Sequence, residues 1–136
     1  MKTRIARTLA AAAIALGVAA PLAGPAFAGG SFTIQVFTND PREAAALRGS
    51  LAAIAAGKGV RGSGIYQRGT GNAAGLMQNG QGNYGLVMQE GQGHTGTVSQ
   101  NGNGNIHGLF QFGRNTTSHV AQTGHGKAGA TIQFGW

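Results

Sequence analysis

Seven glutamines recur at intervals of eleven residues through the C-terminal half of the chain, without a single slip in spacing. They are Gln67, Gln78, Gln89, Gln100, Gln111, Gln122 and Gln133. A short, fixed period repeated this often is typical of stacked structural units that bury one face against their neighbours. The repeat therefore constrains the fold of residues 61–136 more than any other feature of the sequence.

Four further columns keep the same register. The residue two positions after each glutamine is a glycine: Gly69, Gly80, Gly91, Gly102, Gly113, Gly124 and Gly135. The residue two positions before it is apolar in six of the seven units, and the residue five positions after it is asparagine in three: Asn72, Asn83 and Asn105. Because the apolar, glutamine and asparagine columns and a column of small residues two positions further on follow the two-residue period of a strand, we expect them to share one strand face.

Each unit is expected to form a seven-residue strand followed by a four-residue turn, in which glycine supplies the positive φ that reverses the chain. Two units make one coil of twenty-two residues, and coils stack ~4.8 Å apart through backbone hydrogen bonds. The sequence thus predicts an all-β fold, a two-sheet β-solenoid of seven units. One sheet would contain strands 61–67, 83–89, 105–111 and 127–133, and the other strands 72–78, 94–100 and 116–122.

The segment from Gln67 to Gln78 resembles the curlin repeat, Gln-x-Gly-x-x-Asn-x-Ala-x-x-x-Gln, of the secreted subunits of bacterial curli fibres. It matches at every fixed position, and the next unit changes only the small residue, to Gly85. Later units depart further from the pattern, with His94, Thr116, Lys127 and His107 at its fixed positions.

The resemblance implies a secreted structural subunit that polymerises at the cell surface into an extracellular functional amyloid, serving adhesion and the biofilm matrix. It also implies passage through a dedicated outer-membrane secretion pore and a nucleating or co-polymerising curlin partner. Whether this chain would be a major or a nucleating subunit stays open.

The chemistry of the columns points the same way. Identical amide side chains stacked at the strand spacing can hydrogen-bond along the stack, so we expect continuous glutamine and asparagine ladders. Strands 61–67 and 127–133 would leave open backbone edges, which can template the addition of another copy. Head-to-tail self-assembly into a cross-β fibre follows. The odd number of units leaves the last coil half complete, and either residues 31–37 or a strand of a partner would fill it.

The N-terminal residues 1–28 have the pattern of a secretory signal peptide. Three basic residues, Lys2, Arg4 and Arg7, precede an apolar run too short for a spanning helix, and Ala26-Phe27-Ala28 supplies a cleavage site. We expect the exported chain to begin at Gly29 and to have no membrane span. The whole chain has a formal charge of +7, and loss of the three basic residues leaves +4.

Residues 29–60 precede the repeat and predict a strand and a helix. Phe32, Ile34 and Val36 alternate through a strand at 31–37, and a helix at 41–56 follows Asp40, which can cap its first turn. Pro41 suits the first helical position, and Glu43 can reach back as in a capping box. One face of this helix is apolar: Ala44, Leu47, Leu51 and Ile54.

An apolar stripe is expected on the outer face of the larger sheet. It contains Tyr66, Met88, Phe110 and Ile132. A contiguous apolar patch usually marks an interface, so we expect the helix at 41–56, with the strand before it, to pack over the stripe. Bundling of neighbouring filaments is the alternative use of this stripe.

Other functions have weaker support. His94, His107, His119 and His125 fall in four different columns, which argues against a shared metal site. Few acids are present to support catalysis, and the basic residues form no cluster for nucleic acid. We therefore expect no enzyme activity, cofactor, metal or specific nucleic-acid binding. The alternative function is a monomeric β-solenoid that binds ice or another surface, although Thr95-Gly96-Thr97 is the only Thr-x-Thr pair in the sequence.

Overall fold

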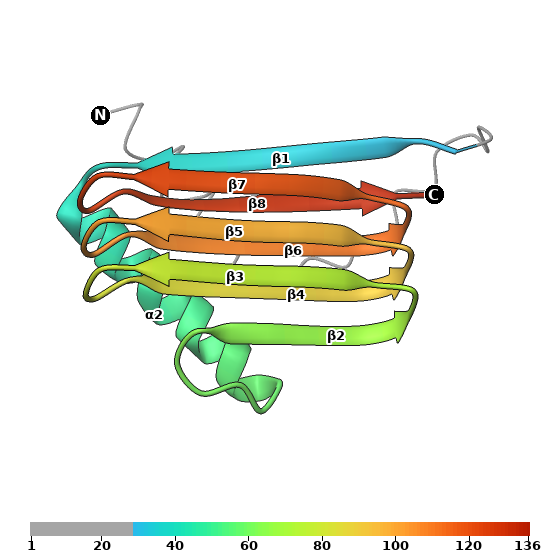
Figure 1. Cartoon of the computed structure of the whole chain (residues 1–136), viewed down its shortest axis with the longest axis horizontal. Coiled ribbons are helices and arrows are strands. Elements are labelled where there is room, and N and C mark those ends of the chain that lie inside the picture. The colour runs from blue at the N-terminus through green and yellow to red at the C-terminus, as the bar shows by residue number, and fades with distance from the viewer. Residues whose placement is uncertain (1–28) are drawn as a thin grey trace.

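The computed structural model describes residues 29–136 and contains a β-solenoid of about three turns with a repeat of about 22 residues (Figure 1). The predicted fold is confirmed. The signal peptide predicted for residues 1–28 lies outside the described residues.

Two sheets face each other across the solenoid. Four parallel strands form most of the five-stranded sheet: β2 (Gly64–Thr70), β4 (Tyr84–Gln92), β6 (Ile106–Arg114) and β8 (Ala128–Gly135). Three parallel strands form the three-stranded sheet: β3 (Ala73–Asn79), β5 (Thr95–Asn101) and β7 (Thr117–Thr123). Residues that pair between these parallel strands are 22 positions apart, as Gln67 with Gln89 and Gln78 with Gln100. The fifth strand of the larger sheet, β1 (Ser31–Thr38), pairs antiparallel with β8.

The predicted strand bounds were wrong by one to three residues. All repeat strands begin later than expected, and those of the five-stranded sheet also continue two or three residues beyond the predicted ends. The strands of the five-stranded sheet end late because their column glycines stay in the ladder despite a positive φ; Gly69 pairs in register with Gly91, and Gly91 with Gly113. The corner that leads into the three-stranded sheet therefore has two residues, and only the opposite corner has the expected four.

Glycine is required at these positions by the approach of the next coil as well as by φ. Gly91 has a φ of 135°, and a Cβ built on it would lie 1.9 Å from the carbonyl oxygen of Gly113. The same contact recurs from coil to coil at Gly69, Gly80, Gly102 and Gly113. Since no side chain fits in such a space, the glycine column allows the coils to stack at strand spacing.

The helix α2 (Pro41–Gly57) begins much as predicted. Asp40 is the N-cap, and its Oδ1 accepts a hydrogen bond of 2.8 Å from the backbone N–H of Arg42. The expected capping box is wrong in one detail, since Glu43 accepts from the Thr38 hydroxyl, and Thr38 Oγ1 accepts from the Asp40 N–H at 3.1 Å. The hydroxyl of Thr38 thus relays the contact because it lies between the carboxylate and the amide.

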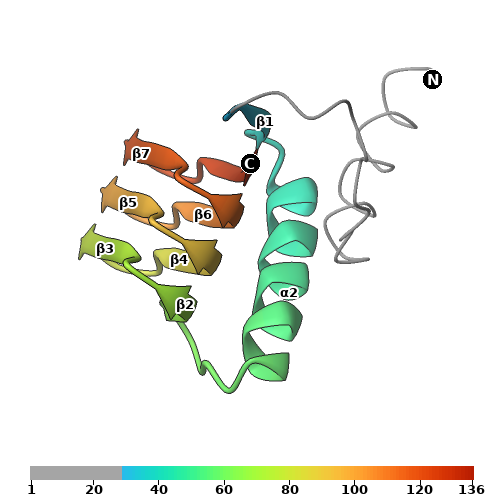
Figure 2. The same ribbon diagram turned by 90° about the vertical axis from the view of Figure 1, so that its right-hand side faces the viewer.

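The helix covers the outer face of the five-stranded sheet, which confirms the prediction that it packs over the apolar stripe (Figure 2). Its buried residues are Ala44, Leu47, Leu51 and Ala55. They pack with Met88, Phe110 and neighbouring apolar side chains, and Tyr66 and Ile132 are partly buried beside them. Ile54, expected on the buried face, is only partly buried, and Ala55 takes that position.

The strand at 31–37 was predicted correctly in type but not in place. It does not lie over the apolar stripe; it extends the five-stranded sheet, pairing with β8 from Ser31 opposite Gly135 to Thr38 opposite Ala128. The expectation of an open edge at strand 127–133 is therefore wrong for the single chain. A segment before the repeat can cap this edge because α2 returns the chain along the whole sheet (Figure 1).

Candidate assembly site

A ladder of glutamine amides runs through the interior on the side of the five-stranded sheet. The Nε2 of Gln67 donates to Oε1 of Gln89 at 2.7 Å, Gln89 donates to Gln111 at 2.7 Å, and Gln111 donates to Gln133 at 2.9 Å. The side chains of Gln89 and Gln111 are fully buried. All donors point the same way along the stack, toward the C-terminal end.

A second ladder lies on the side of the three-stranded sheet. Gln78 donates to Gln100 at 2.8 Å, and Gln100 donates to Gln122 at 2.9 Å. It has the same direction as the first ladder. Both predicted glutamine ladders are therefore present.

The remaining N–H of these amides ties the two sheets together. Gln89 Nε2 also donates to the backbone carbonyl of Ala73 on β3 at 2.9 Å, and Gln100 Nε2 to that of Tyr84 on β4 at 2.9 Å. Gln111, Gln122 and Gln133 make the same contact, each with the carbonyl sixteen residues earlier. Each internal amide is thus satisfied by one bond along the stack and one across it, which offsets the cost of its burial.

The asparagine column does not form the amide-to-amide ladder that the sequence predicted. Asn83 Nδ2 donates to the carbonyl of Gly102 at 2.8 Å, and its Oδ1 accepts from the backbone N–H of Asn105 at 3.0 Å. Asn72 and Asn105 make equivalent pairs of bonds to the next coil. The shorter side chain reaches the corner backbone of the next coil before it reaches another amide, so this column fastens the corners.

One departure from the asparagine pattern, His94, keeps part of this role. His94 Nδ1 lies 2.7 Å from the Thr116 hydroxyl and accepts from the Thr116 backbone N–H at 3.4 Å. The imidazole nitrogen thereby replaces an asparagine oxygen. Burial lowers the pKa of His94 from its ordinary value, which favours the neutral ring that can accept these bonds.

His107 occupies the column of small residues inside the coil. Its side chain is fully buried, and its Nε2 lies 3.0 Å from the hydroxyl of Thr131. Nδ1 has no partner within residues 29–136, and the ring of Phe37 lies 6.1 Å away. Burial lowers the pKa of His107 to about 4, so this histidine is neutral over most of the pH range.

The direction of the ladders makes the two ends of the solenoid chemically different. At the N-terminal end, Gln67 and Gln78 are exposed, and no donor from residues 29–136 reaches the Oε1 of either. At the C-terminal end, the two columns stop at Gln122 and Gln133, and the Nε2 of each has no further glutamine to which it can donate. One end therefore offers acceptors and the other offers donors.

The strand β1 closes only part of the C-terminal end. The Nε2 of Gln133 donates to the hydroxyl of Thr33 at 3.3 Å, which ends the first ladder. In the three-stranded sheet, β7 stays at the edge of the described strands, and Gln122 Nε2 bonds only to the carbonyl of Ile106 within them. Phe37 lies on the side of β1 that faces the empty position beside β7, and its side chain is 61% exposed.

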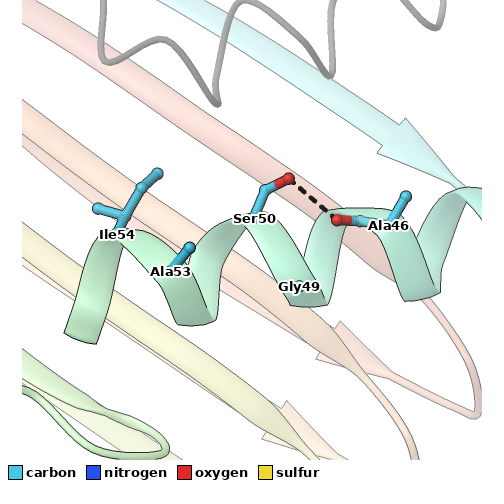
Figure 3. Close-up of a pocket in the computed structure, with 5 residues that line it drawn as sticks. All are labelled: Ala46, Gly49, Ser50, Ala53 and Ile54. Carbon is cyan, nitrogen blue, oxygen red and sulfur yellow. Dashed lines mark hydrogen bonds between the residues drawn. The ribbon is translucent and has the colours of Figure 1, made fainter. Parts of the chain in front are cut away.

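A hollow lies on the outer side of α2 (Figure 3) and is lined by Ala46, Gly49, Ser50, Ala53 and Ile54. The hydroxyl of Ser50 donates to the carbonyl of Ala46 within the helix. Apart from Ser50, the lining consists of glycine and apolar side chains.

The described part of the chain holds no group of three or more metal-ligating side chains. Lys58 and Glu90 form an ion pair of 2.8 Å that joins the end of α2 to β4. No helix within residues 29–136 is long and apolar enough to cross a membrane.

Comparison with protein-family models, curated proteins and solved structures found no match to this chain. What the molecule can do must therefore be argued from its geometry.

Two contributors to the site were missed by the sequence reasoning. The bond from Gln133 to Thr33 depends on β1 lying beside β8, and the alternation of polar Thr33 and Gln35 with apolar residues on β1 was the only sign of it. The ties from glutamine to the opposite sheet could have been expected, because a primary amide has two N–H donors and a ladder uses one.

Proposed function

We propose that this protein is a secreted structural subunit that self-assembles into extracellular cross-β fibres, as its resemblance to curlins implies. The observation that carries the proposal is the pair of directional glutamine ladders. Each has a free acceptor at its N-terminal end; at the C-terminal end the Gln122 donor has no ladder partner, and Thr33 of β1 holds the Gln133 donor. Stacking a second copy satisfies these groups and extends both sheets. The open edges of β2, β3 and β7 supply the backbone hydrogen bonds.

The partners and location of such a subunit follow from the same proposal. Export would use a signal peptide within residues 1–28 and an outer-membrane secretion pore, and a nucleating curlin subunit would start the fibre. The assembled fibre would lie at the cell surface and serve adhesion and the biofilm matrix. We propose no enzymatic, metal or cofactor role.

The test is to leave the purified protein in buffer and follow thioflavin fluorescence together with electron microscopy. The proposal expects a lag, a rise in fluorescence and unbranched filaments, with the lag removed by adding preformed filaments. Protein that stays monomeric at high concentration, with or without such seeds, would rule the proposal out.

The capped edge of β8 favours one alternative, a monomeric solenoid that binds ice or another surface. The outer face of the three-stranded sheet is not covered by α2, and Thr95 pairs in register with Thr117 on it. The array is broken at the next position, where the hydroxyl of Thr97 bonds to His119 at 2.7 Å. Arrest of ice growth by monomeric protein would support this alternative over the fibre.

A further inference from the structure

Because the number of repeat strands is odd, the two sheets end at different levels along the stack. The last repeat strand is β8 in the five-stranded sheet and β7 in the three-stranded sheet. After β8, the repeat would place its next strand in the three-stranded sheet, beside β7, and no described strand lies there. The strand β1 does not fill this place, because it continues the other sheet beyond β8. A second copy stacked without rotation, with its β2 in place of β1, would leave the position beside β7 empty.

A half turn of the second copy about the stack axis removes this gap. Its β2 then lies beside β7, and its β3 lies beside β8. Both new pairs are parallel, as are the pairs β2 with β4 and β3 with β5 within one chain. Successive units alternate between the sheets, so an eighth unit belongs in the three-stranded sheet.

We propose that the edges of β7 and β8 form one acceptor surface for β2 and β3 of a second copy turned by half a turn, and that β1 blocks the β8 part of this surface until it is displaced. This inference rests on the proposed function and names the surface through which the fibre grows.

The amide ladders fit this arrangement. Gln122, whose column ends at β7, would donate to the free Oε1 of Gln67 in the second copy, and Gln133 would donate to Gln78. The second bond would replace the present one from Gln133 to the Thr33 hydroxyl, which at 3.3 Å is longer than the 2.7 Å contact between Gln67 and Gln89. Displacing β1 therefore exchanges a long hydrogen bond for the contact that the rest of the ladder uses.

The glycine column supports the same docking at β7. Gly102 has a φ of 121° and lies against the carbonyl of Gly124, which has a φ of 116°. The described atoms nearest to a Cβ on Gly124 belong only to the flexible side chain of Lys127, at 3.4 Å. The backbone of β7 thus has the shape that receives a further coil, and Gly69 of the second copy would supply the matching carbonyl.

The position of α2 also favours the half turn. Figure 2 shows the end of α2 and the loop after it reaching past β2 on the helix side of the solenoid. If the second copy were stacked without rotation, the end of its α2 and the loop after it would meet α2 of the first copy. After a half turn they face the outer surface of the three-stranded sheet near β7, on the side of the solenoid that α2 does not cover.

The attachment of β1 is suited to exchange. Its residues from Ser31 to Gln35 are all exposed, and Val36 and Thr38 alone are partly buried. Backbone hydrogen bonds to β8 hold most of the strand, and an incoming strand can replace them one for one. Little apolar burial is lost when β1 leaves.

A disulfide lock tests the displacement. The chain has no cysteine, and Phe32 lies opposite Phe134 in a hydrogen-bonded pair, two positions from the pair of Gly30 and Trp136. The Cα atoms of such a pair are about 5.5 Å apart, which a disulfide can bridge. The variant Phe32→Cys/Phe134→Cys should lose fibre growth when oxidised and regain it when reduced.

The control is a lock that leaves the acceptor surface free. Met77 and Ser99 pair in register on β3 and β5, so Met77→Cys/Ser99→Cys should grow fibres in both redox states. Equal growth of the oxidised and reduced β1 lock would overturn the displacement while leaving the fibre function intact. Absence of fibres from the wild-type protein would instead defeat the proposed function.

Proline variants give a second measure that needs no disulfide. In the alternating pattern set by Gly30 and Trp136, the N–H of Ile34 bonds to β8, whereas that of Gln35 faces away. Ile34→Pro should loosen β1 and shorten the lag of fibre growth, and Gln35→Pro should change the lag much less. Equal lags for the two variants would contradict the blocking role of β1.

Cysteine trapping between copies tests the half turn. Arg68 of the second copy would lie beside Thr123 after a half turn, but beside Phe134 in an unrotated stack. Fibres grown from mixed Arg68→Cys and Thr123→Cys proteins should give disulfide-linked dimers on oxidation, and the mixture of Arg68→Cys with Phe134→Cys should not. The reverse result, or growing fibres in which neither pair cross-links, would overturn the half-turn arrangement.

Discussion

The two sheets of the solenoid share one repeat and are held together in different ways. The five-stranded sheet carries an apolar outer face that α2 covers, and β1 caps its last strand. The three-stranded sheet has an uncovered outer face, and within residues 29–136 no strand pairs with the outer edge of β3 or of β7. It depends on coil stacking and on the amides between the sheets.

This difference shows how a solenoid can stay regular when only one of its sheets is covered on the outer face. Burial against α2 stabilises the five-stranded sheet. The hydrogen bonds from glutamine side chains to the backbone of the opposite sheet hold the three-stranded sheet against it. The three-stranded sheet is also the one with an empty position that a further copy could fill.

Alanine at Gly102 should have the largest effect on the three-stranded sheet. A Cβ there would lie 1.9 Å from the Gly124 carbonyl, and φ is 121°, so we expect a loss of about 4 kcal/mol or more in unfolding free energy. Gly124→Ala is the control, because it has a similar φ and no such backbone contact. Urea unfolding followed by circular dichroism would measure both, and equal losses would mean that stacking contributes nothing beyond backbone strain.

Removing a core side chain of α2 should test the role of burial in the five-stranded sheet. Leu51 is 0% exposed, and Leu51→Ala should cost about 2–5 kcal/mol because it leaves a cavity above β6. Met77→Ala on the uncovered sheet should change stability little, since Met77 is 67% exposed. Similar urea midpoints for the two variants would contradict the difference between the outer faces.

Acid should act on the five-stranded sheet through His107. In the unfolded chain this histidine binds a proton near its ordinary pKa of 6.5, whereas burial holds its pKa at about 4 in the fold. The unfolded state therefore binds more protons between these values, and stability should fall by about 3 kcal/mol as pH drops from 6.5 to 4. The lowered pKa of His94 acts in the same direction.

The control for this pH effect is His107→Ala, measured by urea unfolding across the same pH range. Ser118 holds the equivalent position of the three-stranded sheet and does not titrate in this range. The variant should be less stable at neutral pH and should lose most of the slope between pH 6.5 and 4. An unchanged slope would assign the acid sensitivity to other groups.

The smallest effect is expected from single ladder amides. Gln100→Ala leaves the Tyr84 carbonyl and the Gln122 oxygen without their donor, and should cost about 1–3 kcal/mol. Gln78→Ala should cost less, because Gln78 is exposed at the end of its ladder. If unfolding showed the two variants to be equally stable, the internal amide bonds would not be stabilising the three-stranded sheet.

The regular part of the fold could be predicted from the sequence because one period determines both strand and register. A spacing of eleven puts Gln67, Gln89 and Gln111 in one column whatever the details of the corners. The corners were predicted less well, since glycine at positive φ can stay in a ladder, as Gly91 does opposite Gly113. Local preferences do not reveal that choice, because it depends on the next coil.

The place of β1 could not be predicted for a related reason. The alternation of Phe32, Ile34 and Val36 predicts a strand. Such a strand can pair with the edge of a sheet as well as pack over its outer face. Its position depends on α2, which spans the sheet and brings Thr38 beside Ala128. The asparagine contacts were missed because side-chain length, and not residue identity alone, decides whether Asn83 reaches an amide or the Gly102 carbonyl.

X-ray fibre diffraction from aligned filaments of the purified protein tests the central claim most directly. Coils that continue from one copy to the next must give a meridional reflection at ~4.8 Å, with strands perpendicular to the filament axis. Filaments that lack this reflection, or a solution that yields only monomers to align, would contradict assembly through the ends of the solenoid.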